Sequence, residues 1–220
     1  MKKRIGVLGS GAVGKMLSQG FQKKGHSVRI GTEHPEKLAE WAQENKNITI
    51  GNFSETISNS DIVILAVKGT AAEAFMKKFA QELDGKVVVD ATNPIADKPP
   101  VNGVIQFFTS LDKSLMEILQ AAAPKAKLVK AFNSVGNAFM IDPQFDGTHP
   151  TMFICGNDSG AKKEVTDLLQ TVGWEAEDMG QMESARAIEP LCMLWCIPGM
   201  IRNQWGHAFK LLEQKTLVNV

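Results

Sequence analysis

Short, continuous runs of apolar residues alternate along the chain with longer stretches in which apolar positions recur every three or four residues. Continuous runs are typical of parallel strands that helices cover on both faces, and the recurring spacing is typical of helices. We expect strands over 5–8, 27–30, 47–50, 61–67, 86–90, 127–131 and 151–154, and a short extended piece over 174–177. We expect helices over 13–24, 35–45, 71–83, 111–119 and 161–172. This order predicts right-handed βαβ units on a mostly parallel sheet, an α/β fold.

The first expected strand runs into a glycine-rich turn that opens the first helix. The turn consists of Gly9, Ser10, Gly11, Ala12, Val13 and Gly14. Gly9 permits a tight turn, Gly11 lets a pyrophosphate approach the backbone, and Gly14 lets the helix pack close to the sheet. The start of the helix would present its free N–H groups to the phosphates. The motif predicts a dinucleotide site, and a purely structural glycine turn is the alternative.

The end of the second strand bears on the choice between NAD and NADP. An acid there would hold the ribose hydroxyls of NAD, whereas a hydroxyl group with cations would hold the 2′-phosphate of NADP. Thr32 stands where the acid is expected, and Lys37 lies about one helical turn further on. Glu33 could repel the phosphate, reach a ribose hydroxyl, or simply be a solvated residue at a helix start. These residues favour NADP and leave NAD open.

Further residues follow the later strands at the carboxyl edge of the sheet, where ligands bind in open parallel sheets. Those expected to face the cofactor or substrate are Ala66, Val67, Lys68, Asn93, Pro94, Ala131 and Asn133. Asn93 and Asn133 could orient a nicotinamide amide or a substrate carbonyl, or else cap their own turns. The proline-rich loop 94–104 suits an active-site flap.

The sequence offers no set of residues for acid–base or metal chemistry. Its histidines are scattered at positions 26, 34, 149 and 207, and its three cysteines lack the paired spacings of a zinc site. We therefore name no catalytic residue and expect no metal. Hydride transfer between two stacked rings fits this absence, because the cofactors carry the reactivity and the protein positions them.

The composition excludes several classes of partner. Lys and Arg number 24 and Asp and Glu number 24, so the net charge is zero and a nucleic-acid surface is not expected. The longest apolar run, 191–201, is interrupted by Pro198-Gly199 and is far below the roughly 20 residues of a membrane span. An odd number of cysteines and no export signal fit a reducing compartment. We expect a cytoplasmic protein that acts on a small-molecule substrate.

The composition shifts near Gln181, after which Met, Cys and Trp become frequent and helix is expected. Cys192 and Cys196 would share a helix face and pack there, and Glu183, Arg186 and Glu189 are interpreted as a surface charge ladder. Large apolar residues gather here, so we expect a homodimer; the alternative is that the segment folds back onto the sheet. These residues are Met193, Trp195, Ile197, Met200, Ile201 and Trp205.

Six segments, taken in order, resemble the NADP reductases that use coenzyme F420. They are GSGAVG, GTEHPEK, DIVILAV, VVVDATNP, VKAFNSVGN and SARAIEPLCMLW, and they span nearly the whole chain. The wider family also contains ferric-reductase oxidoreductase domains. The resemblance implies a Rossmann fold, with a doubly wound, mostly parallel sheet and a small C-terminal helical region. It also implies hydride transfer between NADP(H) and a deazaflavin, in a dimer whose interface includes the C-terminal helices.

Carried over by position, residues 9–14 match the phosphate loop, Thr32 the hydroxyl residue at the 2′-phosphate, and Lys37 a cation there. Glu33 replaces an arginine of the family at the 2′-phosphate site, so NAD remains an alternative cofactor. We divide the chain into a dinucleotide-binding domain, 1–180, and a C-terminal helical segment, 181–220. We expect an NAD(P)-dependent oxidoreductase with F420 or a flavin as second substrate. The alternatives are a small-metabolite reductase and an NAD(P)-binding sensor without turnover.

Overall fold

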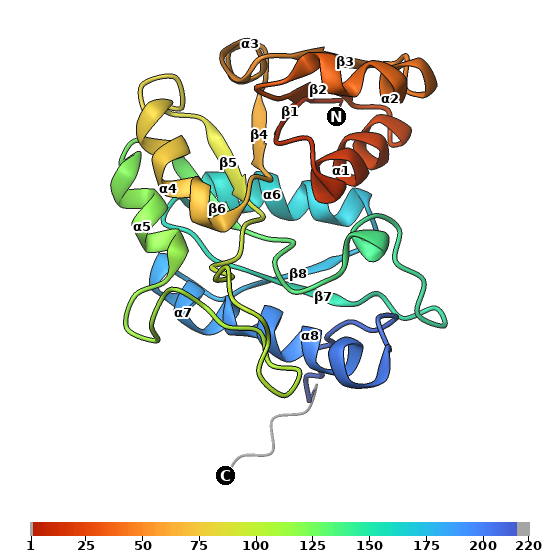
Figure 1. The fold of residues 1–220 in the computed structure, drawn as a ribbon, viewed down its shortest axis with the longest axis vertical. Helices are drawn as coiled ribbons and strands as arrows, with labels where there is room; N and C mark the ends of the chain where they lie inside the picture. The colour runs from red at the N-terminus through yellow and green to blue at the C-terminus, as the bar shows by residue number, and fades with distance from the viewer. Residues whose placement is uncertain (1, 215–220) are drawn as a thin grey trace.

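The apolar runs form a six-stranded parallel sheet with the strand order β3-β2-β1-β4-β5-β6 (Figure 1). The strands are β1 (Arg4–Leu8), β2 (Ser27–Gly31), β3 (Ile48–Gly51), β4 (Ile62–Leu65), β5 (Val87–Asp90) and β6 (Lys127–Lys130). This computed structural model describes residues 2–214. The direction in which successive strands are added reverses between β1 and β4, so the sheet is doubly wound. The predicted Rossmann-type α/β class is therefore confirmed.

Helices cover both faces of this sheet, which explains why its strands are apolar at successive positions. The helices before the C-terminal segment are α1 (Ala12–Lys23), η1 (Pro35–Leu38), α2 (Ala39–Glu44), α3 (Phe53–Ser58), α4 (Gly69–Lys78), α5 (Leu115–Ala122), η2 (Asn137–Phe139) and α6 (Ser159–Thr171). In β4, Ile62 and Ile64 pack into the cluster that contains residues of α1 and α6. Val63 and Leu65 pack into the opposite cluster, with residues of α3, α4 and α5. Both faces of the strand are thus buried, as its sequence predicts.

A second, two-stranded parallel sheet extends the domain. It consists of β7 (Thr151–Ile154) and β8 (Glu175–Asp178), which α6 connects. The backbone N–H of Lys130 donates to the carbonyl of Cys155 at 2.9 Å, in an antiparallel bridge between the end of β6 and the end of β7. This bridge fixes the second sheet against the carboxyl edge of the first.

The C-terminal segment begins with η3 (Met182–Ser184), α7 (Ala185–Ile188) and α8 (Pro190–Arg202). Pro198-Gly199 interrupts the apolar run in the sequence, but it does not end the helix, and α8 continues through Pro198. The helix ends at Asn203, whose φ is 53°, and the N–H groups of Asn203 and Gln204 donate to the carbonyls of Gly199 and Pro198. Residues 203–214 have no regular secondary structure, and 215–220 lie outside the described residues. None of the helices within 2–214 is long and apolar enough to cross a bilayer.

Two helix starts differ from the expectation, for the same reason. The helix expected from residue 111 begins at Leu115, and Leu111 is a loop residue with 76% of its surface exposed. Ser114 and Glu117 form a capping box, in which the Ser114 hydroxyl accepts from the Glu117 N–H and the Glu117 carboxylate accepts from the Ser114 N–H. The unexpected helix α3 begins with the same device at Asn52 and Glu55. The spacing of the capping residues decides both starts, whereas apolar periodicity does not.

Glu117 also joins the C-terminal segment to the sheet domain. Arg186 of α7 donates to both of its carboxylate oxygens, at 3.0 and 2.6 Å. Arg186 therefore pairs across elements, and its expected place in a surface charge ladder with Glu183 and Glu189 is wrong. The Arg186 guanidinium, helped by the Ser114 hydrogen bonds, lowers the pKa of Glu117 from 4.5 to about 2.

We expect Glu117→Gln to lower the free energy of unfolding at pH 7 by about 1–2 kcal/mol, since one charge-assisted pair and half of a capping box are lost. A carboxylate whose pKa is lowered by folding stabilises the fold above pH 4.5, and this contribution is lost as the pH falls towards 2. Urea denaturation between pH 7 and pH 2 should show wild type and variant converging. A difference that stays constant with pH would contradict the electrostatic explanation.

Candidate functional site

The turn between β1 and α1 lies at the carboxyl edge of the sheet, beside the point where the strand order reverses. Gly9 has a φ of 120°, and a Cβ there would lie 2.4 Å from the carbonyl oxygen of Ala66. A Cβ on Gly14 would lie 1.9 Å from the carbonyl oxygen of Gly9. Both positions therefore require glycine. A Cβ on Gly11 would meet nothing within 4 Å, so open space lies beside the loop where a pyrophosphate could approach.

The start of α1 is suited to an anion. Gly11 is the N-cap residue, no side chain caps the helix start, and its first turn contains no acidic residue. The first N–H groups of a helix have no intrahelical partners, and they carry the positive end of the helix dipole. The uncapped start of α1 beside the open space at Gly11 therefore fits the phosphates of a dinucleotide.

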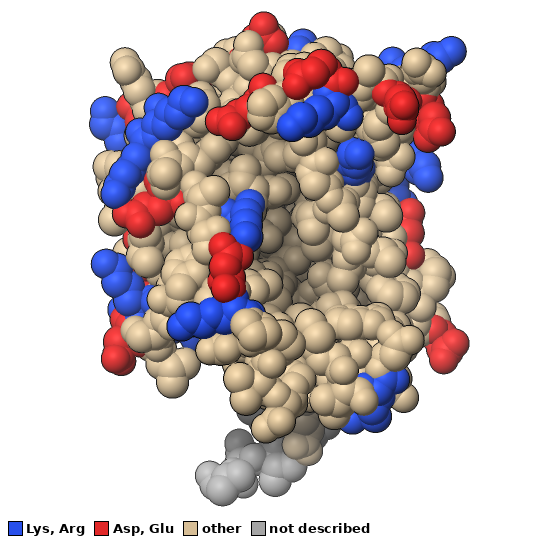
Figure 2. Space-filling model, viewed as in Figure 1, with Lys and Arg blue, Asp and Glu red and all other residues tan. Residues whose placement is uncertain are grey.

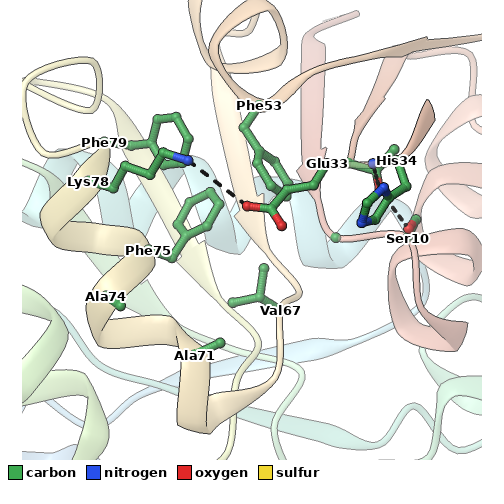
Figure 3. A pocket seen from close by; sticks show the side chains of 12 residues that line it. Ser10, Glu33, His34, Phe53, Val67, Ala71, Ala74, Phe75, Lys78 and Phe79 are labelled. Atoms are coloured by element: carbon green, nitrogen blue, oxygen red, sulfur yellow. Dashed lines mark hydrogen bonds and ion pairs between the residues drawn. The ribbon is translucent and has the colours of Figure 1, made fainter.

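A cavity of about 400 Å³ opens between the ends of β1 and β2 on one side and α4 on the other (Figure 3). Its lining residues are Gly9, Ser10, Thr32, Glu33, His34, Phe53, Val67, Ala71, Ala74, Phe75, Lys78 and Phe79. Three of them, Phe53, Phe75 and Phe79, pack together with ring centroids 4.6 to 5.7 Å apart. One wall is thus aromatic and the opposite wall polar, an arrangement that suits a nucleoside.

Thr32 is the buried centre of the polar wall. Its hydroxyl oxygen accepts from the Ser10 hydroxyl at 3.1 Å and from the His34 N–H at 3.2 Å. Because both of these groups donate to Thr32, its own proton is left to donate to a ligand. The structure therefore places Ser10 and Thr32 together, as the sequence predicts.

The charged residues at this cavity differ in part from those expected, because Glu33 lines it but Lys78 stands in place of Lys37. The carboxylate of Glu33 points across the mouth towards the ammonium of Lys78 on α4, at 4.0 Å (Figure 3). Lys37 lies exposed on η1 and does not line the cavity. Lys78 is 45 residues from Glu33 in the chain, and no local spacing in the sequence could have linked them.

A second cavity, of about 280 Å³, adjoins the first along the end of β4, and Val67 lines both. Its lining residues are Val13, Ala66, Val67, Lys68, Gly69, Ala91, Thr92, Asn93, Ile95 and Asp97. Lys68 and Asp97 form an ion pair at 2.5 Å, and both side chains are largely exposed. Figure 2 shows the corresponding face hollowed at its middle, with mainly uncharged walls and charged side chains at the rim.

Two asparagines link this second cavity to the C-terminal segment. The Asn93 amide nitrogen donates to the backbone carbonyl of Asn133 at 2.8 Å, and the Asn133 amide nitrogen donates to the carbonyl of Ile188 at 2.9 Å. The Oδ1 atoms of both asparagines are buried and accept no hydrogen bond from the described residues 2–214. Buried acceptors normally have a donor, and Asn93 lines the cavity, so its oxygen fits an N–H group of a carboxamide such as that of nicotinamide.

Three residues expected at this edge, Asn133, Ala131 and Pro94, do not line either cavity. Ala131 is fully buried in the core, and Pro94 is buried with its carbonyl accepting from the N–H of Phe108. The histidines remain dispersed, and within residues 2–214 no group of three or more His, Cys, Asp or Glu side chains is arranged to hold a metal ion. Trp195, expected to contribute apolar surface, is buried within the protomer against Gly136.

A buried ion cluster that the sequence analysis missed lies behind the second cavity. The Lys130 ammonium contacts the carboxylates of Asp90 at 2.9 Å and Glu189 at 3.0 Å, and the side-chain exposure of the three is 0%, 0% and 2%. Burial alone would lower the pKa of Lys130, but the two carboxylates outweigh it and raise that pKa. The interpretation of Glu189 as a surface residue is therefore wrong. The available signal was a charged residue at the end of each of two strands, Asp90 in β5 and Lys130 in β6.

Comparisons with known proteins agree with this geometry. Residues 4–94 match the sequence model of the family described as NADP oxidoreductase, coenzyme F420-dependent. The F420-dependent NADP reductase of Methanocaldococcus jannaschii is 31% identical over 186 residues, which cover 78% of this chain and 81% of that protein. The chain belongs to the coenzyme F420-dependent NADP oxidoreductase family. Membership places it among the NAD(P)-dependent oxidoreductases.

Two further comparisons show how far the likeness extends. The crystal structure of a candidate F420-dependent NADP reductase from Arthrobacter sp. FB24 superposes with a TM-score of 0.89 at 29% identity, over 96% of this chain and 100% of that one. The metalloreductase STEAP3 of Rattus norvegicus is 28% identical over 203 residues, which cover 90% of this chain. This chain spans only 39% of the metalloreductase, so the likeness concerns one part of that larger protein.

We expect Gly11→Ala to weaken binding of NADPH at least tenfold without changing thermal stability. The φ of Gly11 is −72°, which alanine adopts without strain, and the added methyl group would occupy the open space beside the loop. Gly206→Ala is the matched control, because its Cβ would make only an ordinary contact, 3.7 Å from Phe139. Calorimetric titration and thermal melting measure the two effects. An unchanged affinity in Gly11→Ala would contradict the assignment of the phosphate loop.

Proposed function

We propose that this chain binds NADP(H) at the carboxyl edge of its sheet and transfers a hydride between the nicotinamide and a deazaflavin- or flavin-type substrate. One observation carries the proposal. The uncapped start of α1, with open space at Gly11, lies between a nucleoside-sized cavity and a second cavity that holds an unpartnered amide oxygen, that of Asn93. A dinucleotide has its phosphates between two such ends.

The first cavity would hold the adenosine half. The aromatic wall of Phe53, Phe75 and Phe79 suits the adenine ring, and the hydroxyls of Ser10 and Thr32 suit the ribose and its 2′-phosphate. The ammonium of Lys78 is the cation on this cavity, and a 2′-phosphate needs one. Because adenine and ribose are common to NAD and NADP, Lys78 is the feature that favours NADP.

The second cavity would hold the nicotinamide half, which supplies the hydride chemistry when bound. Asn93 would accept from the carboxamide and fix the ring, while Val13, Ala66 and Ala91 give the cavity an apolar wall that excludes water. Lys68 and Asp97 are the titratable groups among the lining residues described, and they neutralise one another. Such a lining suits transfer between two rings better than reduction of a small carbonyl or imine, which calls for a proton donor.

The choice of F420 or a flavin as the proposed hydride acceptor rests on the relatives rather than on a pocket of this chain. The Methanocaldococcus jannaschii relative is named an F420-dependent NADP reductase, and the description of the family names the same coenzyme. We therefore propose F420 or a flavin of similar shape as the second substrate. The loop after Pro94, from which Ile95 and Asp97 reach the second cavity, is the element next to which that ring would lie.

We expect NADPH to bind at least tenfold more tightly than NADH, a difference of about 1.4 kcal/mol in binding free energy. Lys78→Met should remove most of this preference by weakening NADPH alone. Lys37→Met is the matched control and should leave the preference nearly unchanged, because Lys37 does not line the cavity. Calorimetry, or quenching of tryptophan fluorescence, measures the affinities of wild type and both variants for NADPH and NADH.

Three outcomes would contradict the proposed function. Tighter binding of NADH, together with its loss in Glu33→Gln, would show that Glu33 holds the ribose hydroxyls of NAD. Binding of NADPH without oxidation by F420, FMN or FAD would favour a sensor, and oxidation by an imine or ketone alone would favour a small-metabolite reductase.

We also propose that the protein is a homodimer that associates through α8. Leu194, Met200 and Ile201 are exposed on this helix, and the part of the surface over α8 in Figure 2 carries few charged side chains. Light scattering after size-exclusion chromatography should give twice the 24.0 kDa of one chain. A mass of 24.0 kDa at all concentrations would contradict the dimer.

A further inference from the structure

The Lys130 ammonium has no proton left for chemistry. Its three donors are used by Asp90 Oδ2 at 2.9 Å, Glu189 Oε1 at 3.0 Å and the backbone carbonyl of Thr92 at 2.8 Å. A lysine ammonium has three protons, so this group is fully satisfied and shielded from solvent. Lys130 can therefore act only by holding other groups in place.

The cluster carries two carboxylates for one ammonium, and backbone donors balance the excess negative charge. Glu189 accepts from the N–H groups of Leu115 and Met116 at the start of α5, both at 2.9 Å. This position is favourable for a carboxylate, because the positive end of the helix dipole lies there. Glu189 comes from the junction of α7 and α8, so the cluster binds the C-terminal segment to β5, β6 and α5.

On the sheet side, the cluster fixes the backbone that carries Asn93. Asp90 Oδ1 accepts from the N–H and the hydroxyl of Thr92, at 2.9 and 2.6 Å, and Lys130 holds the Thr92 carbonyl. Thr92 and Asn93 both line the second cavity. Thr92, the residue before Asn93, is thus held at both its backbone N–H and its backbone C=O.

On the C-terminal side, the cluster fixes the orientation of both amides. Ile188, the residue before Glu189, accepts from the Asn133 amide nitrogen, and the Asn133 backbone carbonyl accepts from the Asn93 amide nitrogen. With both nitrogens bound to backbone carbonyls, the oxygens are the ends left without partners. A shift of Ile188 and Glu189 would release this arrangement.

We propose that Asp90, Lys130 and Glu189 are positioning residues for the nicotinamide half of the site, and that the C-terminal segment completes this half through Glu189. The adenosine half is built on β1, β2 and α4. None of Asp90, Lys130 and Glu189 is among the residues that line its cavity. Loss of the cluster should therefore weaken recognition of one half of the cofactor and spare the other. The inference rests on the proposed function in naming the ligand as a nicotinamide dinucleotide.

The test compares two ligands on Glu189→Gln. NADPH reports on both halves of the site, and adenosine 2′,5′-bisphosphate reports on the adenosine half alone. Glu189→Gln leaves Lys130 paired with Asp90, a balanced pair, so the fold should persist. We expect the affinity for NADPH to fall at least tenfold and that for adenosine 2′,5′-bisphosphate to change less than twofold, both measured by calorimetry.

Glu117→Gln is the matched control. Glu117 also accepts hydrogen bonds at the start of α5, but its partners are Ser114 and Arg186 and it does not contact Lys130. It should leave the ratio of the two affinities unchanged, which separates loss of the cluster from loss of a helix cap. Asp90→Asn, which keeps the Lys130–Glu189 pair, is the second variant if Glu189→Gln does not fold, and the same selective loss is expected.

The outcomes are distinguishable. If both ligands weaken together in Glu189→Gln, or neither does, the positioning role is wrong while the dinucleotide site stands. If wild type binds neither ligand, the proposed function itself is wrong.

Discussion

The buried ammonium of Lys130 is the constraint on which the geometry of the carboxyl edge depends. It lies between Asp90 and Glu189 with no exposed surface. Removing one partner of a buried ion pair typically costs about 3–5 kcal/mol, because a charge is left without compensation. The ends of β5 and β6, the start of α5 and the α7–α8 junction must therefore keep one relative position. The second cavity is built on this position.

The carboxyl edge is divided into two halves that different parts of the chain build. The adenosine-type cavity is formed by the glycine turn after β1 and by the aromatic wall from α3 and α4. The second cavity depends on Asn93, which long-range contacts hold through Asn133 and Ile188. Val67 at the end of β4 is shared, so an extended dinucleotide would cross the sheet where its strand order reverses. These two halves can position the reacting rings and exclude water from them, and a hydride transfer needs these two contributions rather than acid–base groups.

The features that the sequence predicts are those that depend on neighbouring residues. The continuous apolar run of β4 indicates burial on both faces, and the glycine motif predicts the turn that is found, which requires glycine at positions 9 and 14. Lys78 and Glu189 could not be predicted, because each meets its partner only through the fold. The spacing of Glu189 from Arg186 suggests a solvated helix face, yet Lys130, 59 residues earlier, draws the carboxylate into the interior. Local patterns thus predict the scaffold and the glycine turn, whereas the charged contacts at the site follow from tertiary structure.

Hydride transfer to a deazaflavin-type ring is the central claim, and a deuterium label tests it most directly. The protein would be mixed with NADPH that carries deuterium at the reactive carbon of the nicotinamide, in either configuration, and with F420 or a 5-deazaflavin. The account predicts that mass spectrometry finds the label bound to carbon in the reduced deazaflavin, for one of the two configurations. Oxidation of NADPH with the deuterium recovered in water would contradict it. So would the absence of deuterium transfer both to F420 and to the 5-deazaflavin.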